Sequence, residues 1–368
     1  MTSIPVPVVT GCSAITALGR SLAETARGLS EGRCGIAPVD DIPSRPGASP
    51  AARIGAFSTE PELPRSKARR FDRGSQFAVV AARQCVADAG YEVAGHEERT
   101  GVLLGTGSAG AGPLTDFERQ MATESPDSAS PFLFPYTVAN APASIVALEL
   151  GLKGPNVTVI QKDPAALNAL FYGRLMLADG RADALLVGAA DEWAPTYHAA
   201  YEHLHITRTE GRAGFALGEG AGAILVEREE TARARGARIL ARLAAVVTRP
   251  IPLSPHRRRA GSAQLQAVLR AALEEAGCAP GDVSLVHLSA NGVPWVDAAE
   301  RDALGEVFGP ALPRTEEVKL SIGENPFAGA VQLALAAAAL GTGSEHGAVL
   351  IDAFGAGGNF FAAVLTRG

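Results

Sequence analysis

The chain of 368 residues is poor in cysteine, lacks an excess of positive charge and contains no hydrophobic run long enough to cross a membrane. Its four cysteines are scattered, form no CxxC pair and have no histidine at zinc-ligand spacing. The sequence therefore predicts neither a disulfide framework nor a metal site. It suits a reducing, cytoplasmic environment.

Lysine and arginine number 33 against 39 aspartates and glutamates, a formal net charge of −6. Such a balance provides no global positive field for a nucleic-acid backbone. The most basic run, residues 256–259, is interpreted as a solvated loop, although an acidic carrier protein could use it. The N-terminus has no basic segment before its apolar stretch, and the most apolar expected helix, 328–340, is too short for a bilayer. We expect neither nucleic acid nor a membrane as a partner.

What the chain does have is the composition of a globular protein. Hydrophobic residues make up 47% and charged residues 20%, with 41 glycines and 24 prolines. These values exclude disorder, collagen and coiled coil. The length suits one large domain or two moderate ones.

Two parts of the chain resemble each other in order. The segment RQCVADAG (83–90) leads to the strand-like GVLLGTGS, and LRAALEEAG (269–277) leads to VSLVHLSANG. The stretches that begin at Val157 and Val318 both read as strand, turn, apolar helix and strand. This self-similarity indicates a duplicated unit.

The expected helices 164–178 and 326–340 are apolar almost all round, as is typical of helices buried between two sheets. The strands carry Val, Ile and Leu on both faces, which favours mostly parallel sheets covered by helices. We predict an α/β fold of five layers, αβαβα. It consists of two duplicated halves, 1–235 and 236–368, and we place their boundary in a charged helical stretch, 227–243.

The two buried helices begin with similar residues. Asp163 and Pro164 precede one helix, and Glu324, Asn325 and Pro326 precede the other. Proline suits the first helical position because its missing N–H would be unpaired there. Asp163 is therefore predicted to be an N-cap, stabilised as an anion by the helix dipole. This structural interpretation stands beside the functional one below.

Several motifs carry a specific resemblance, and they occur in one characteristic order: VVTGCSAITALG, FDRGSQFAVVAARQCVADAG, ANAPASIVALELGLKGPN, GRADALLVGAADE, GFALGEGAGAILVE and FGAGGNF. On these motifs the chain resembles the β-ketoacyl synthase family, of the thiolase fold, along nearly its full length. The resemblance implies a thiolase-like fold and a site at the starts of the two buried helices.

The resemblance places the family's active-site cysteine on Asp163, inside QKDPAA, with no gap between GPN and GRAD. The cysteine acts as a thiolate favoured by the helix dipole. A carboxylate there could form only a high-energy mixed anhydride with an acyl chain and would repel an anionic thioester. Ordinary thioester loading is therefore not expected.

The family's two histidines, which assist decarboxylation, are also replaced. Asn291 stands at the first position, and a downstream Asp297 and Glu300 fit the family's acid pair. The second turn keeps Lys319 and places Glu324 at the histidine position; because this turn is one residue short, Asn325 is the alternative. Neither an amide nor a carboxylate supplies the acid–base behaviour of imidazole.

Loss of all three positions predicts a catalytically silent subunit, a chain-length factor that pairs with an active ketosynthase in type II polyketide synthesis. Its shortened connections resemble those of polyene-forming partners. The resemblance implies no cofactor other than the acyl chain carried on phosphopantetheine by an acyl carrier protein. A second hypothesis is a stand-alone acyl-processing enzyme with Asp163 and Glu324 as paired carboxylates. A scaffold with no role in a tunnel is the third.

Family-like pairing would make 112–123 an interface helix beside the acyl tunnel. Leu114, Phe117 and Met121 form an apolar stripe at spacings of three and four, which also suits core packing. Phe132, Phe134 and Tyr136 alternate as in a short extended segment and are candidates for a wall that faces the partner.

The run GTGSAG (105–110) matches the GxGxxG pattern of dinucleotide sites. We expect Gly112 and Pro113 to break the helix that such a site requires, and no suitable acidic residue follows a second strand. A nicotinamide site is therefore not predicted.

Overall fold

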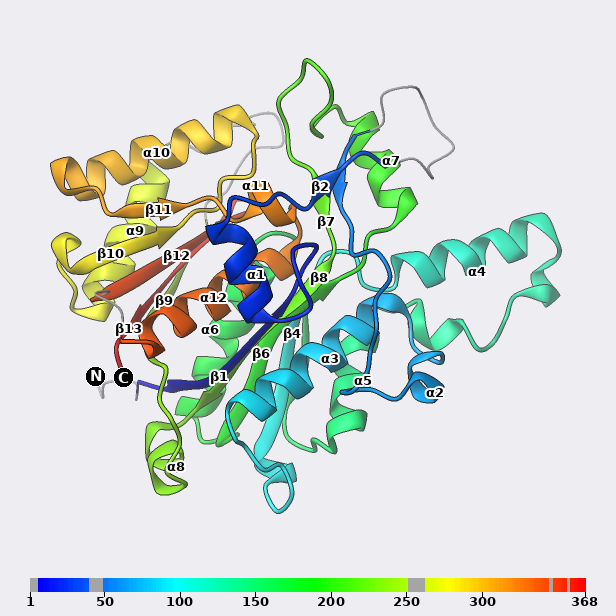
Figure 1. The fold of residues 1–368 in the computed structure, drawn as a ribbon, viewed down its shortest axis with the longest axis horizontal. Helices are drawn as coiled ribbons and strands as arrows, with labels where there is room; N and C mark the ends of the chain where they lie inside the picture. The colour runs from blue at the N-terminus through cyan, green and yellow to red at the C-terminus, as the bar shows by residue number, and fades with distance from the viewer. Residues whose placement is uncertain (1–5, 40–48, 251–261, 344–346, 356–357) are drawn as a thin grey trace.

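The computed structural model describes residues 6–39, 49–250, 262–343, 347–355 and 358–368, and nearly all of its strands lie in one folded sheet (Figure 1). Within these ranges the strands run in the order β11-β10-β12-β13-β9-β1-β8-β6-β4-β5. Their bounds are β1 (Val8–Ile15), β4 (Thr100–Thr106), β5 (Asn156–Ile160), β6 (Ala184–Asp191), β8 (Gly220–Glu227), β9 (Ala241–Pro250), β10 (Val283–His287), β11 (Arg314–Glu316), β12 (Ala348–Phe354) and β13 (Asn359–Thr366).

The sheet consists of two blocks with the same internal order. If the five strands of each block are numbered along the chain, their order across the sheet, from the outer edge inwards, is 3-2-4-5-1 in both blocks. The blocks join only where β1 meets β9, through the pairs Val8↔Arg242 and Val9↔Ala241. The prediction of a duplicated unit is confirmed.

Helices cover the blocks on both sides and also fill the space between them (Figure 1). The outer face of the first block packs against α3 (Arg73–Asp88) and α5 (Ala141–Leu150), and that of the second against α9 (Ser262–Ala276) and α10 (Pro294–Phe308). The central helices α6 (Ala165–Ala178) and α12 (Pro326–Gly341) contact strands of both blocks. The predicted five-layered thiolase-like fold is confirmed.

Alternation along the strands explains why both faces of each block are buried. In β6, Leu185, Val187 and Ala189 point into the central core around α6 and α12, whereas Leu186 and Ala190 point into the outer core against α3. Successive side chains of a strand lie on opposite faces. Strands of this kind must therefore be apolar along their whole length.

The stretch 227–243 is less helical than predicted. Only α8 (Glu229–Ala234) is a helix; Glu227 ends β8 and Leu243 lies within β9. Gly236, with φ +69°, follows the helix and stops it. Beyond this turn the chain enters the sheet, where pairing with β1 and β13 overrides helical propensity.

An arm projects from the body and contains α4 (Ala111–Thr123), η2 (Pro126–Ser128) and η3 (Phe134–Tyr136) (Figure 1). Two predictions about it were wrong. Gly112 and Pro113 do not break the helix, because Pro113 lies in its first turn, where no intrahelical N–H bond is lost. Residues 131–136 are not extended but form turns, with Tyr136 N–H donating to Leu133 O at 2.9 Å.

The remaining elements are short and connect the layers. They are α1 (Leu22–Ser30), β2 (Ile36–Ala37), β3 (Ala51–Ala52), α2 (Arg65–Ala68), η1 (Glu97–Arg99), α7 (Pro195–His203), β7 (Leu217–Gly218), η4 (Pro280–Asp282), η5 (Gly309–Ala311) and α11 (Lys319–Ile322). No helix in the described ranges has both the length and the apolarity that crossing a membrane requires.

Candidate functional site

The candidate site lies where the carboxyl ends of β5, β10, β11 and β12 meet the N-terminal ends of α6 and α12. Parallel strands place their carboxyl ends on one edge of a sheet. Asp163, Asn291 and Glu324 lie in loops at this edge, Lys319 begins α11, and Phe354 ends β12. The fold thus brings together residues that are up to 191 positions apart in the chain, from 163 to 354.

Close packing fixes the start of α6. A Cβ on Gly105 of β4 would lie 2.6 Å from the Ala165 carbonyl carbon, so only glycine lets the first turn of α6 approach the sheet this closely. The N-cap is Pro164, and no side chain caps the helix. The prediction of Asp163 as N-cap was wrong, because the helix starts one residue later and its Ala165 N–H bonds the Lys162 carbonyl.

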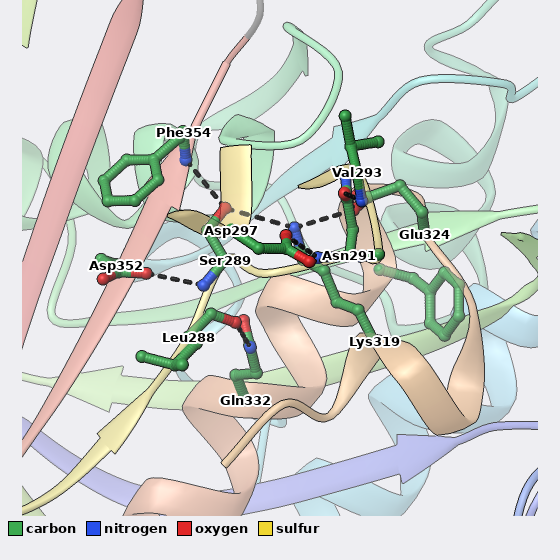
Figure 2. Close-up of polar contacts among 12 residues, drawn as sticks. Leu288, Ser289, Asn291, Val293, Asp297, Lys319, Glu324, Gln332, Asp352 and Phe354 are labelled. Carbon is green, nitrogen blue, oxygen red and sulfur yellow. Dashed lines mark hydrogen bonds and ion pairs between the residues drawn. The ribbon is translucent and has the colours of Figure 1, made fainter. Parts of the chain in front are cut away.

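Glu324 is the centre of the polar contacts in the site. Its side chain is almost fully buried, and its Oε2 accepts a hydrogen bond from Asn291 Nδ2 at 3.0 Å and pairs with Lys319 Nζ at 3.1 Å (Figure 2). Asn325 instead directs its amide to the Gly218 carbonyl at 2.6 Å. The structure therefore places the Glu324 carboxyl, and not the Asn325 side chain, among the site residues.

Glu324 is a carboxyl group with a raised pKa. Burial, and next the nearby Asp163 carboxyl, raise the pKa of Glu324 to about 8, although Lys319 and Asn291 act to lower it. Near neutral pH the Glu324 carboxyl is therefore mainly protonated.

Lys319 is the cation of the site. Burial alone would lower the pKa of its ammonium group, but the carboxyls of Glu324 and Asp163 outweigh burial and raise it. Lys319 is consequently charged and cannot act as a general base at neutral pH.

Asn291 is held in one orientation. Its Oδ1 accepts from Val293 N–H at 3.1 Å, which leaves its Nδ2 directed at Glu324. The Asn291 backbone N–H and the next one, of Gly292, both donate to Asp297, each at 3.1 Å. The amide therefore takes part in a fixed hydrogen-bond network, and it neither gains nor loses a proton near neutral pH.

A second carboxyl pair, Glu300 and Asp352, lies behind Ser289. The Ser289 N–H donates to both carboxyls, at 2.7 Å each, and burial raises the pKa of Glu300 well above its ordinary value and that of Asp352 to about 6. The Ser289 hydroxyl accepts from Phe354 N–H at 3.1 Å. Asp352 had not been predicted, although a lone acid in the apolar strand VLIDAF was the signal for it.

A cavity of about 150 Å³ opens beside this network. Asp163, Ser289 and Asn291 line its polar end, and the other walls are mainly apolar. None of the four cysteines lines it, and neither does any histidine of the described residues. Burial raises the pKa of Cys12 to about 12 and that of Cys85 well above its ordinary value, so neither supplies a thiolate at neutral pH.

The side chains predicted to face a tunnel or partner are divided between two environments. Those of Leu114, Met121, Phe132 and Phe134 are exposed on the arm, and the Phe117 ring packs on Phe134 with centroids 6.0 Å apart. Tyr136 packs instead against the outer core beside α3. The stripe on α4 is thus not buried in the protein core.

The glycine run 105–110 is occupied by a carboxylate of the protein itself. Asp191 Oδ1 accepts from the N–H groups of Gly107 and Ser108, at 2.7 and 3.0 Å. The backbone donors that would hold a phosphate in a dinucleotide site are therefore already used. This contact, rather than a broken helix, argues against such a site.

The described ranges contain no group of three or more His, Cys, Asp and Glu side chains placed to hold a metal ion. The basic run 256–259 lies outside the described residues.

Glu324→Gln is expected to flatten the pH dependence of stability between about pH 5 and 8. The pKa of Glu324 is about 8 in the folded chain against 4.5 ordinarily, so the folded state binds the extra proton and loses stability as pH rises through this window. Glutamine cannot titrate, so a slope of up to about 1.4 kcal/mol per pH unit disappears. Denaturant unfolding at several pH values measures it. Glu118→Gln, at an exposed position, is the control, and an unchanged slope in Glu324→Gln would contradict the raised pKa of Glu324.

Comparison with known proteins gives matches over most of the chain. The model of the beta-ketoacyl synthase N-terminal domain matches residues 6–232, and that of the C-terminal domain matches residues 254–344. The 3-oxoacyl-(acyl-carrier-protein) synthase 2 of Staphylococcus aureus (strain N315) is 29% identical over 329 residues, covering 83% of this chain and 77% of that protein.

Solved structures share the fold over nearly the full length. The ishigamide ketosynthase/chain length factor superposes with a TM-score of 0.88 at 24% identity, covering 99% of both chains. The structure of a type II PKS acyl-carrier protein in complex with its ketosynthase bound to the hexaketide contains a chain that superposes with a TM-score of 0.87 at 19% identity, again covering 99% of both chains. At these identities the likeness is one of fold.

Proposed function

Because the chain belongs to the beta-ketoacyl synthase family, we propose that it is a catalytically silent subunit, a chain-length factor, which pairs with an active ketosynthase in type II polyketide synthesis. One observation carries this proposal. At the start of α6, where the resemblance places a thiolate, stands Asp163, and nearby Glu324 is paired with Lys319. No nucleophile is left to accept an acyl chain.

The chemistry of the network supports silence. A thioester acyl group transfers to a thiolate because the product is again a thioester, whereas transfer to a carboxylate gives an anhydride of much higher energy. A malonyl carboxylate would also meet the carboxyl group of Asp163 and the protonated carboxyl of Glu324, neither of which offers it a positive charge. Asn291 donates its amide to Glu324 and supplies no acid or base.

The partner surface we propose combines the arm with the neighbouring sheet edge. β5 is the outermost strand of its block, and Ile160 at its end is 66% exposed. On the arm, Phe132 is 84% and Phe134 60% exposed. Unpaired strand edges and clustered exposed aromatics are typical of surfaces that another chain covers. The catalytic ketosynthase is the partner we assign to this surface.

An acyl carrier protein is the second partner in this proposal. Arg65, Arg69 and Arg70 are exposed on and just after α2, whereas nearby Lys67 is paired with Glu149 at 3.2 Å. Exposed positive charge of this kind steers an acidic protein to a docking site. A ketosynthase of the same fold is known in complex with its acyl carrier protein, as the comparison above describes.

The purified chain, alone and mixed with a cognate ketosynthase, tests the proposal. The chain alone should show no condensation of malonyl units, and the mixture should elute as a one-to-one complex with condensing activity. The matched control is the ketosynthase alone. Robust condensation by the isolated chain would exclude a silent subunit.

The rival is a stand-alone enzyme in which the pair Asp163–Glu324 acts as general acid and base. The raised pKa of Glu324 favours it, since a carboxyl with a pKa of about 8 can both donate and accept near neutral pH. In that case the chain alone would process an acyl or hydroxyacyl substrate, and Asp163→Ala and Glu324→Ala would each abolish the activity.

A further inference from the structure

The cavity beside Asp163 has the shape and the walls of a small-molecule site. Its apolar walls include Phe215, Val296, Phe354 and Phe360, contributed by both halves of the chain. Apolar cavities near 150 Å³ hold a ligand about the size of a benzene ring. The apolar body of a ligand would therefore be compact.

The charged group at the polar end of this cavity is the carboxyl of Asp163. Lys319 does not line the cavity: its ammonium pairs with Glu324 and lies 3.5 Å from Ser289 Oγ, with only 2% of its side chain exposed. The Asn291 Nδ2 donates to Glu324 as well. A ligand that reaches this end meets one carboxyl and the neutral side chains of Ser289 and Asn291.

The charges around Asp163 decide which ligand suits this end. Glu324 and Lys319 face it directly, and the pair Glu300 and Asp352 lies beyond Lys319 and Ser289. Carboxyl groups outnumber the single ammonium group in this network, and Asp163 is the one charged residue that lines the cavity. An anion in the cavity therefore meets no opposite charge, whereas a cation at Asp163 does.

We propose that this cavity binds a small primary ammonium compound with a compact apolar body, such as benzylamine, through the Asp163 carboxylate. The ammonium group donates to Asp163, and the ring lies between the apolar walls. This site is a property of the chain itself and does not depend on its pairing with a ketosynthase.

Binding of such a cation is linked to release of the proton of Glu324. A cation at Asp163 favours the ionised form of the nearby Glu324 carboxyl, so that proton passes to the buffer. The affinity should therefore rise as pH approaches 8, where Glu324 begins to lose its proton unaided. Above that range the gain stops.

Calorimetry on the full chain with three ligands of similar shape tests the proposal. Benzylamine should bind at least about ten-fold more tightly than benzyl alcohol, and benzoate should not bind. Titration of benzylamine in buffers of different ionisation enthalpy should reveal proton release at pH 7. Equal binding of amine and alcohol, or binding of benzoate, would overturn the proposal.

Two variants identify the site. Asp163→Asn should abolish the preference for the amine, and Ala299→Leu, which fills the apolar part, should weaken amine and alcohol together. Glu118→Gln removes a charge at an exposed position and should change nothing. Retention of the amine preference by Asp163→Asn would refute the assignment. The comparison of the three ligands on the unchanged chain decides the matter even if a variant fails to fold.

Discussion

A complex of this chain with an active ketosynthase should lose condensation at least about a thousand-fold when the partner's nucleophilic cysteine is removed, yet stay within about two-fold when Asp163→Asn is introduced here. The asymmetry follows from the site. Removing a nucleophile that forms a covalent intermediate abolishes its step. Asparagine in place of Asp163 removes only a carboxyl that the proposed reaction never uses.

The measurement is the rate of product formation by each complex at the same concentration of assembled pairs. Size-exclusion chromatography of every variant supplies the control, because a fall caused by dissociation would mimic a catalytic loss. A thousand-fold fall with Asp163→Asn in an intact complex would instead place chemistry in this chain and favour the paired-carboxylate enzyme.

The layers of the fold could be predicted because they depend on apolar patterns of many residues, in which a single exception matters little. Strands apolar on both faces and helices apolar all round have few ways to be buried, and the repeat fixed how the two halves correspond. Arrangements decided by single residues were harder. Asp163 missed the N-cap by one position because Pro164 took it, and the start of β9 at Ala241 was hidden by helix-forming neighbours.

The site itself was predictable in its members but not in their bonds. The resemblance identified Asp163, Asn291, Lys319 and Glu324, and the fold brings all four together. It could not indicate that Glu324, rather than Asn325, carries the network. That choice depends on the backbone, since the Glu324 N–H pairs with the Ala216 carbonyl at 2.7 Å and fixes which side chain turns inward.

Two carboxyl pairs around one buried lysine make the site costly to maintain. The free-energy cost of burying a charge is offset only where each charged group has a partner, and such networks often contribute little net stability. Here Lys319 balances Glu324, and the Ser289 N–H is shared by Glu300 and Asp352. The network fills the space of a reaction centre with fixed hydrogen bonds, which agrees with a subunit whose scaffold is kept and whose chemistry has been replaced.

The arm should account for a large part of the affinity for the ketosynthase. The variant carrying Phe132→Asp and Phe134→Asp is expected to bind its partner at least about 100-fold more weakly, because exposed aromatics become the dominant contacts when an interface closes. Thermal stability of the isolated chain should change little, since both side chains are mostly exposed there and only the contact of Phe134 with Phe117 is lost. Biolayer interferometry against the immobilised ketosynthase measures the affinity.

Leu204→Asp is the matched control for this experiment, because Leu204 is also 60% exposed but follows the C-terminal end of α7 and is not part of the arm. It should leave the affinity unchanged. Unchanged affinity of the Phe132→Asp and Phe134→Asp variant would show that the partner docks elsewhere.

Smaller changes on α4, Phe117→Ala and Met121→Ala, keep most of the surface and should alter product length in an intact complex. Unchanged product length would support the hypothesis of a scaffold with no role in a tunnel.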